Sequence, residues 1–276
     1  MTSAKPELGL RLLSAAILLP IAIVLIVRGG LPFAVLVGVV AGCSVYEVCA
    51  MALRPLPKVA WIAVLAGAAL PIFGGLHPGD FEPLLRGFAG ACLLVLGAGF
   101  VSALVAENPP AAVSRSIWMV TGLAYCALPL GLIGLLRMGR DGAWWVLLAC
   151  TVTWMNDTGA YFAGRAFGRH KLVPKVSPNK TWEGFVGGTI ASVASALAVK
   201  AVGFHALTLA DCLVIGLLAA FFGPLGDLSE SLLKRSLGVK DSSRLIPGHG
   251  GVLDRIDALL FNGVLVFAYA DALGRL

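Results

Sequence analysis

Long apolar runs separated by short polar segments constrain the fold of this 276-residue chain more than any other feature. A hydrocarbon core about 30 Å thick is crossed by about 20 helical residues. Runs near that length lie at 10–28, 31–53, 59–76, 88–106, 117–136, 143–163, 184–203, 208–226 and 252–273. Glycine, proline and charge coincide at the breaks between these runs, where helices end. The pattern predicts an all-α fold, a polytopic integral membrane bundle of about nine transmembrane helices.

Charge is scarce and unevenly distributed, which excludes an ordinary soluble protein. Charged residues make up 13% of the chain, whereas soluble domains carry about 25%. The net charge is +6, but the basic residues lie between apolar runs, as positive-inside topology and anionic lipids require. The sequence has no DNA-binding motif and no aromatic and basic platform. We therefore expect membrane lipids, and not nucleic acid, as partners.

The basic residues also predict an orientation. If the N-terminus is cytoplasmic, all but six of the 21 Lys and Arg residues fall on the cytoplasmic side. The six exceptions are Arg28, Arg86, Arg137, Arg140, Lys200 and Arg275. Part of the excess lies in two loops with candidate chemistry, so it can also reflect function. We expect a cytoplasmic N-terminus and a C-terminus on the opposite side.

Polar residues concentrate in the second half of the chain. We therefore interpret residues 1–140 as a scaffold of transmembrane helices and 141–276 as a transmembrane catalytic region with cytoplasmic loops. No linker is long enough to set apart a separate soluble domain. Tyr46 and Glu47 are exceptions in the first half, and we expect both at a solvated interface.

The first polar island runs from Asn156 to Arg165, inside or at the end of an apolar run. Asp at the centre of a membrane helix costs at least ~2.5–3.5 kcal/mol. Asp157, Tyr161 and Arg165 are spaced four residues apart and share one helix face. Two interpretations stay open: a polar substrate cavity, or an internal Asp–Arg pair that only holds helices together.

The second island runs from Lys171 to Glu183. Its two prolines exclude a continuous helix, and its three lysines provide positive charge. These lysines suit a topological anchor at the membrane surface. The segment Ser177–Thr181 adds donors suited to phosphate oxygens, which favours contact with a nucleotide or another phosphate.

The third island, residues 227–257, gathers charges of both signs. If its start is helical, one face carries Asp227, Ser231, Lys234 and Arg235. A glycine-rich turn at 247–251 lets backbone N–H groups approach an anion, and two further aspartates follow it. Mg²⁺ prefers one or two carboxylates with phosphate oxygens and waters. This combination favours a Mg²⁺–polyphosphate site.

The same residues resemble the signature of the phosphatidate cytidylyltransferase (CDP-diacylglycerol synthase) family. The matching positions are Ser231, Lys234, Arg235, Lys240, Asp241, Gly248, His249, Gly250, Gly251, Asp254, Arg255 and Asp257. Segments 156–161 and 177–184 also resemble blocks of that family. The resemblance covers roughly residues 140–276, while the first half matches only as hydrophobic spans.

This resemblance implies a nucleotidyltransferase of phospholipid biosynthesis that joins CTP and phosphatidic acid into CDP-diacylglycerol and pyrophosphate, with Mg²⁺ as cofactor. A phosphatidate oxygen would attack the CTP α-phosphorus in line, and positioning and charge stabilisation would supply most of the catalysis. It also implies a multi-pass protein of the cell inner (cytoplasmic) membrane, with its active site facing the cytoplasm.

Residue roles follow as hypotheses from this resemblance. Asp227, Asp254 and Asp257 are the expected metal ligands, and they form the expected catalytic set together with Lys234 and Arg255. The expected substrate-binding residues are Asn156, Asp157, Lys175, Ser177, Asn179, Lys180, Ser231, Arg235, Lys240, His249, Gly250 and Gly251.

Two other functional classes stay open. A related CTP-dependent lipid kinase would transfer the γ-phosphoryl group and release CDP instead of pyrophosphate. A transporter would also place charges near broken helices, but it would show paired half-repeats, which the sequence lacks. The sequence leaves open the preferred acyl chains, the order of substrate binding, the role of each aspartate and whether the chain forms a homodimer.

Overall fold

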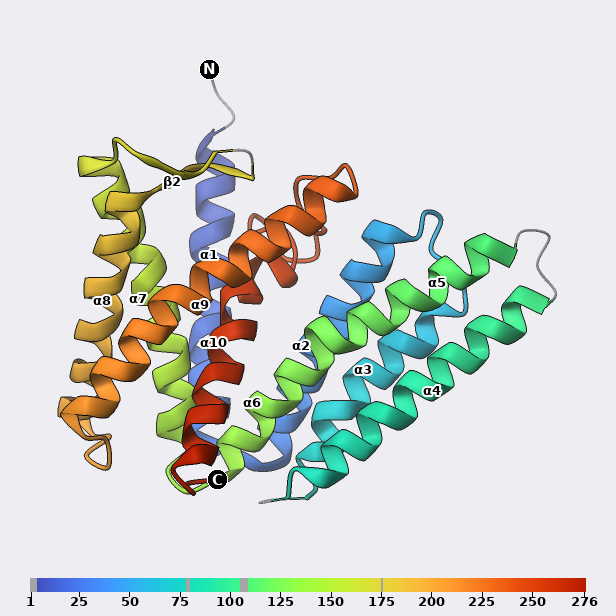
Figure 1. Ribbon diagram of the computed structural model, residues 1–276, viewed down its shortest axis with the longest axis horizontal. Helices are drawn as coiled ribbons and strands as arrows, with labels where there is room; N and C mark the ends of the chain where they lie inside the picture. Colours follow the sequence, from blue (N-terminus) through green and yellow to red (C-terminus); the bar gives the residue numbers. More distant parts are fainter. Residues whose placement is uncertain (1–3, 78–79, 105–108, 175) are drawn as a thin grey trace. The chain divides into compact units, whose positions relative to one another are not determined.

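The computed structural model describes residues 4–77, 80–104, 109–174 and 176–276. Its helices are α1 (Ala4–Arg28), α2 (Gly30–Ala52), α3 (Ala60–Gly74), α4 (Glu82–Leu104), α5 (Pro109–Gly122), η1 (Leu123–Ala127), α6 (Leu128–Met138), α7 (Gly142–Phe167), α8 (Trp182–Val202), α9 (Leu209–Ser236) and α10 (Leu253–Ala272). A two-stranded antiparallel sheet, β1 (Lys171–Val173) with β2 (Ser177–Thr181), joins α7 to α8 (Figure 1).

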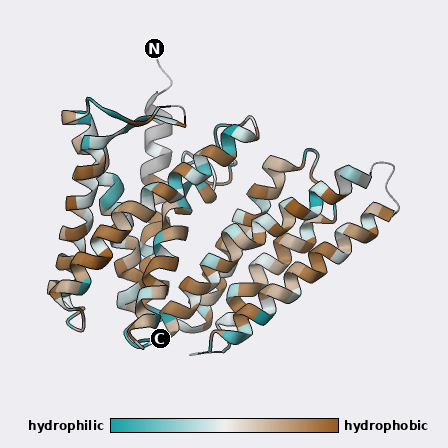
Figure 2. Cartoon of the chain, in the orientation of Figure 1, coloured by the Kyte–Doolittle hydropathy of each residue, from teal (hydrophilic) through white to brown (hydrophobic). Residues whose placement is uncertain are grey.

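The helices confirm the predicted class of a helical, multi-pass membrane protein. Within the described ranges, five helical stretches are long and apolar enough to cross a membrane: α2, α4, the stretch Val113–Met138, α8 and α9. Apolar residues run along most helices, whereas the hairpin between α7 and α8 is largely hydrophilic (Figure 2). The count of nine spans and the cytoplasmic N-terminus stay predictions.

Several element boundaries differ from the predicted runs. Helix α4 begins at Glu82 and not near residue 88, and α9 continues to Ser236 and not to 226. The extension of α9 makes Asp227–Lys234 helical, which the shared polar face requires. The segment 171–181 forms a hairpin with Lys171 opposite Thr181 and Val173 opposite Ser177, which agrees with the exclusion of a continuous helix by the prolines. Strand β2 tolerates Pro178 because each strand of a two-stranded hairpin has a free edge.

The chain folds into two compact units. Unit 1 comprises Met1–Met138 and Val239–Arg255, and unit 2 comprises Gly139–Gly238 and Ile256–Leu276. The division at residue 140 into scaffold and catalytic region concerns function and stays a prediction.

Small residues let the helices of unit 1 approach closely. A Cβ added at Gly38 of α2 would lie 2.6 Å from the backbone oxygen of Ala68 on α3. Val45 and Val48 of α2 are fully buried in the core of this unit. Arg137 at the end of α6 donates to backbone carbonyls of the last turn of α1. This close packing of small residues is the usual way for helices to associate in lipid.

Unit 2 is built on the pair α7 and α8, which lie side by side in Figure 1. A Cβ at Gly159 of α7 would lie 2.5 Å from Cβ of Ala191, and one at Gly187 of α8 would lie 2.2 Å from Cβ of Ala163. The close α7–α8 contact fixes the two helices that flank the hairpin. Glycine packing thereby sets the spacing of the two helices that the hairpin connects.

Helix α9 of the same unit starts at a capping box. Thr208 accepts from the backbone N–H of Asp211, and Asp211 accepts from the backbone N–H of Thr208. The Tyr269 hydroxyl donates to Asp211 at 2.6 Å and ties α10 to this end of α9. The capping residues therefore also anchor a neighbouring helix.

Candidate active site

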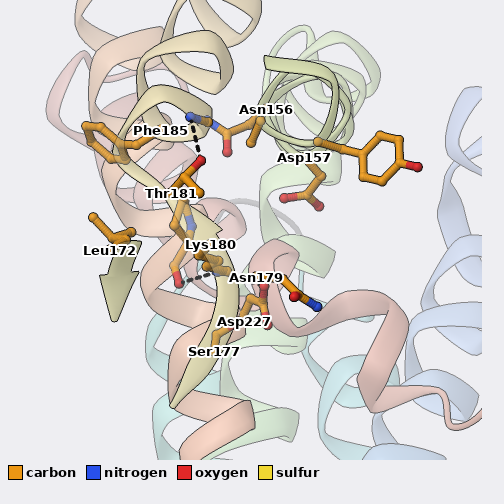
Figure 3. A pocket seen from close by; sticks show the side chains of 13 residues that line it. Asn156, Asp157, Leu172, Ser177, Asn179, Lys180, Thr181, Phe185 and Asp227 are labelled. Atoms are coloured by element: carbon orange, nitrogen blue, oxygen red, sulfur yellow. Dashed lines mark hydrogen bonds and ion pairs between the residues drawn. The ribbon is translucent and has the colours of Figure 1, made fainter. Parts of the chain in front are cut away.

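A pocket of about 320 Å³ lies in unit 2 between α7, the hairpin, α8 and α9 (Figure 3). Its size is within the range of ligand pockets, about 300–1,000 Å³. Its polar lining includes Asn156, Asp157, Ser177, Asn179, Lys180 and Asp227. All six are among the site residues expected from the sequence, and they come from three separate segments of the chain.

Lys180 and Asp227 form the charged centre of the pocket. The Lys180 Nζ lies 2.7 Å from Oδ2 of Asp227 and also donates to the backbone oxygen of Pro224 at 3.2 Å. The other carboxylate oxygen, Oδ1, accepts from the Ser231 hydroxyl at 3.3 Å. Both charged side chains are partly exposed, so a cation and a carboxylate are presented to the same cavity.

The local sequence explains why Lys180 lies there. Thr181, the next residue, is the N-cap of α8 and accepts from the backbone N–H of Gly184 at 3.1 Å. Glu183 accepts from both the backbone N–H and the ring Nδ1 of His170 and closes the base of the hairpin. With β2 fixed at both points, the Lys180 side chain is directed at α9 and not at bulk water.

Helix α7 contributes two side chains, Asn156 and Asp157, whose oxygens can accept hydrogen bonds or bind a cation. Asp157 reaches from α7 toward Lys180, Asn179 and Asp227 in Figure 3. The preceding Asn156 is 2% exposed, and its buried Oδ1 has no hydrogen-bond partner among the described residues. An unsatisfied buried acceptor costs roughly 1–3 kcal/mol. A ligand or cation bound in the pocket could supply the missing partner of this Asn156 oxygen.

A third carboxylate adds to the negative charge of this region. Asp257 on α10 interacts with the charges of Asp227, Asp157 and Lys234. Its Oδ1 accepts from the backbone N–H of Ala258 at 2.7 Å. Helices α9 and α10 are close here, because a Cβ at Gly226 would lie 2.5 Å from the backbone oxygen of Asp257.

These donors fit Mg²⁺ held jointly with a phosphate ligand. No three His, Cys, Asp or Glu side chains of the described chain form a complete protein-only metal site. Mg²⁺ keeps several waters and is commonly bound by one or two carboxylates plus substrate phosphates. Asp157 and Asp227 are carboxylates of this kind, and the orphan oxygen of Asn156 is a further hard donor.

Three further polar residues of unit 2, Lys234, Arg235 and Arg165, do not line the pocket. Lys234 pairs with Glu230 at 2.7 Å, and Glu230 is 1% exposed. Arg235 is exposed at the end of α9. Arg165 donates to the Tyr161 hydroxyl at 3.0 Å, as expected for residues four apart on a helix.

The remaining expected residues belong to unit 1, mostly in the segment 239–252, which we call the glycine loop. Within it, the backbone N–H and hydroxyl of Ser242 and the backbone N–H of Gly251 all donate to Oδ2 of Asp254, at 2.9–3.1 Å. His249 Nδ1 lies 2.8 Å from the Ser14 hydroxyl of α1. Lys240 and Arg255 are exposed.

The sequence prediction for Glu47 was wrong. Its side chain is fully buried and not at a solvated interface. Oε1 accepts from the Ser243 hydroxyl and the backbone N–H of Val252, and Oε2 accepts from the Ser242 hydroxyl and the backbone N–H of Leu253. The available signal was an ionisable residue within an apolar run, which by default indicates a functional position.

The structure thus divides the expected site residues between the units. Unit 2 holds Asn156, Asp157, Ser177, Asn179, Lys180, Asp227, Ser231, Lys234, Arg235 and Asp257. Unit 1 holds Lys240, His249, Gly250, Gly251, Asp254 and Arg255. Lys175 lies outside the described residues.

Fold and pocket define a multi-pass helical membrane protein with a pocket lined by carboxylates and a lysine. A family model described as the cytidylyltransferase family matches residues 9–273, so the chain belongs to this family. The resemblance found in the sequence motifs is confirmed.

Curated relatives carry a more specific name. A phosphatidate cytidylyltransferase of Staphylococcus saprophyticus is 42% identical over 153 residues, which are 54% of this chain and 59% of the relative. One of Bacillus subtilis is 44% identical over 133 residues, 48% of this chain and 49% of the relative. The chain therefore spans about half to three-fifths of the length of these relatives.

Proposed function

We propose that this protein is a Mg²⁺-dependent phosphatidate cytidylyltransferase that converts CTP and phosphatidic acid into CDP-diacylglycerol and pyrophosphate. The observation that carries the proposal is the pocket of unit 2, where Lys180 pairs with Asp227 beside Asp157 and the unsatisfied Asn156. The names of the relatives support this choice of substrates.

The chemistry of the pocket suits nucleotidyl transfer. Phosphate transfer relies mainly on positioning and charge stabilisation. Lys180 offers a cation whose charge Asp227 balances until a phosphate enters the pocket. The hydroxyl of Ser177 and the amide of Asn179 add hydrogen-bond donors on the same hairpin strand. No strong base is needed, because a phosphate monoester is already anionic at neutral pH.

A divalent cation would be held by Asp157 and Asp227, with Asp257 beside them. When bound, Mg²⁺ would neutralise phosphate charge and orient the triphosphate. Asp254 remains a proposed ligand as well. Within unit 1, its Oδ2 lies within hydrogen-bond distance of the backbone N–H and hydroxyl of Ser242 and of the backbone N–H of Gly251, which orient the carboxylate.

We also propose the cell inner (cytoplasmic) membrane as the location, with nine spans and the site facing the cytoplasm. The positive-inside distribution of Lys and Arg supports this orientation. CTP is made in the cytoplasm, and the acyl chains of the lipid would stay in the bilayer during the reaction.

The function is tested with detergent-solubilised protein, radiolabelled CTP, phosphatidic acid and Mg²⁺. We expect label in the lipid phase together with released pyrophosphate. Chelation by EDTA should abolish both, and added Mg²⁺ should restore both. CDP release with a newly phosphorylated lipid would identify a kinase instead, and absence of turnover with any lipid would contradict the proposal.

A further inference from the structure

Glu47 is a fully buried carboxylate that the proposed reaction does not use. It lies on α2 between the buried residues Val45 and Val48. Among the described residues, no Lys or Arg forms an ion pair with it. A buried charge without a cation is costly unless several hydrogen bonds stabilise it. Its stabilisation must therefore come from hydrogen-bond donors.

Two of its four donors are backbone N–H groups at the junction of the glycine loop with α10, those of Val252 and Leu253. The backbone N–H of Val252 lies 2.8 Å from Oε1 of Glu47, and that of Leu253 lies 2.7 Å from Oε2. The first N–H groups of a helix have no partner within the helix, and the helix dipole favours an anion there. Glu47 thus caps α10 from a helix about 200 residues earlier in the sequence.

The other two donors are side chains of the glycine loop. The Ser243 hydroxyl lies 2.5 Å from Oε1, and the Ser242 hydroxyl lies 3.0 Å from Oε2. The same Ser242 hydroxyl lies 2.9 Å from Oδ2 of Asp254, so its single proton is shared between the two carboxylates and links them. Glu47 is connected to Asp254 through one serine.

Gly251 shows how tightly this arrangement is packed. A Cβ at this position would lie 1.8 Å from the Ser242 hydroxyl oxygen and 2.8 Å from both oxygens of Glu47. Its own N–H is directed at Asp254. Only a residue without a side chain fits between the serine and the glutamate, so the glycine here serves packing around Glu47.

We propose that Glu47 is a positioning residue that holds the glycine loop and the carboxylate of Asp254 in the orientation needed for catalysis. It acts through Ser242 and the N-terminus of α10 and does not touch substrate. The catalytic part of this inference rests on the proposed function, because the proposed function assigns Asp254 to the reaction as a metal ligand.

The test compares Glu47→Gln and Glu47→Asp in the full chain, with Glu82→Gln as matched control. Glu82 is an exposed carboxylate of the same unit that pairs only with Arg86 among the described residues. The amide of Glu47→Gln keeps one oxygen acceptor but brings an NH₂ group toward donors. We expect kcat to fall about 10- to 100-fold, as for other residues that orient ligand side chains, while KM for CTP changes less than about threefold. Glu47→Asp should recover part of kcat, and the control should match the wild type.

Trypsin cleavage after Arg244 gives a readout that does not depend on activity. Arg244 is an exposed residue of the glycine loop. With the capping carboxylate neutralised, cleavage there should accelerate about tenfold or more, because the loop opens more often. Ser242→Ala, which removes only the bridge, should lower kcat and be non-additive with Glu47→Gln.

Unchanged kcat and unchanged cleavage in folded Glu47→Gln would overturn the inference, as would a change confined to KM. A fall in the amount of folded protein at normal kcat would mean that Glu47 has only a structural role. If the wild type shows no CTP turnover, the proposed function fails, and the cleavage rate alone then decides whether Glu47 positions the loop.

Discussion

Two groups of carboxylates in this protein, the Glu47–Asp254 cluster of unit 1 and the pocket of unit 2, differ in how completely they are hydrogen-bonded. Each oxygen of Glu47 lies within hydrogen-bond distance of two donors and Oδ2 of Asp254 of three, with the single proton of the Ser242 hydroxyl shared between the two carboxylates. In the pocket, Asp227 has one lysine and one long bond from Ser231. The Oδ1 of Asn156 has no partner in the described part of the chain.

The difference separates Glu47 from the residues of the pocket. A carboxylate such as Glu47, whose two oxygens both have donors, gains little from a ligand. An unsatisfied acceptor beside a cavity keeps its desolvation cost until a ligand arrives. The comparison therefore favours the pocket as a place where a ligand completes an unpaired acceptor, and Glu47 as the residue that organises the glycine loop and Asp254.

The largest effect is expected for Asp227→Asn in the pocket. Loss of this charge removes the partner of Lys180 and a proposed metal ligand. We expect kcat/KM to fall about 10³-fold, the size of effect seen when a group that stabilises transition-state charge is removed. The measurement is lipid-phase cytidine formation, with Asp271→Asn at the exposed end of α10 as control. A change below tenfold would contradict the assignment of the pocket.

The next effect concerns the cluster and is one of stability. Gly251→Ala should lower the free energy of unfolding by about 2 kcal/mol, because the added methyl group has no space beside Ser242 and Glu47. Thermal unfolding in detergent measures it. Gly90→Ala on α4 is the control, since no atom of the described residues outside its own helix turn lies within 4 Å of the added Cβ. Equal stability of both variants would show that the cluster is not tightly packed.

The smallest effect is expected at a single atom of the pocket, Oδ1 of Asn156. Asn156→Leu removes the unsatisfied acceptor, so stability should stay equal or rise, whereas KM for CTP should rise about fivefold through loss of roughly 1 kcal/mol of binding. Thr153→Val is a control with the opposite expected effects. It removes a satisfied buried acceptor, because Thr153 accepts from the side-chain amide of Asn262 at 2.9 Å. It should lower stability and leave KM unchanged. Destabilisation by Asn156→Leu would show that Asn156 serves the fold.

The helical class and the three polar islands could be predicted because their signals are local. Apolar runs of membrane length indicate helices, and prolines indicate breaks. The spacing of Asp227, Ser231 and Lys234 placed them on one face, and the structure continues α9 through all three. The pairing of Lys180 with Asp227 could not be predicted, because it joins a hairpin to a helix 47 positions later in the sequence.

Local hydropathy was enough to predict the membrane class and the approximate positions of most helices, because hydropathy is a property of single segments. Which polar groups satisfy one another depends on the folded structure. Folding buried Glu47 against the glycine loop and left Asn156 unsatisfied beside the pocket. The physical reason is that a hydrogen bond depends on atoms within about 3 Å, and for residues far apart in the chain only folding sets that distance.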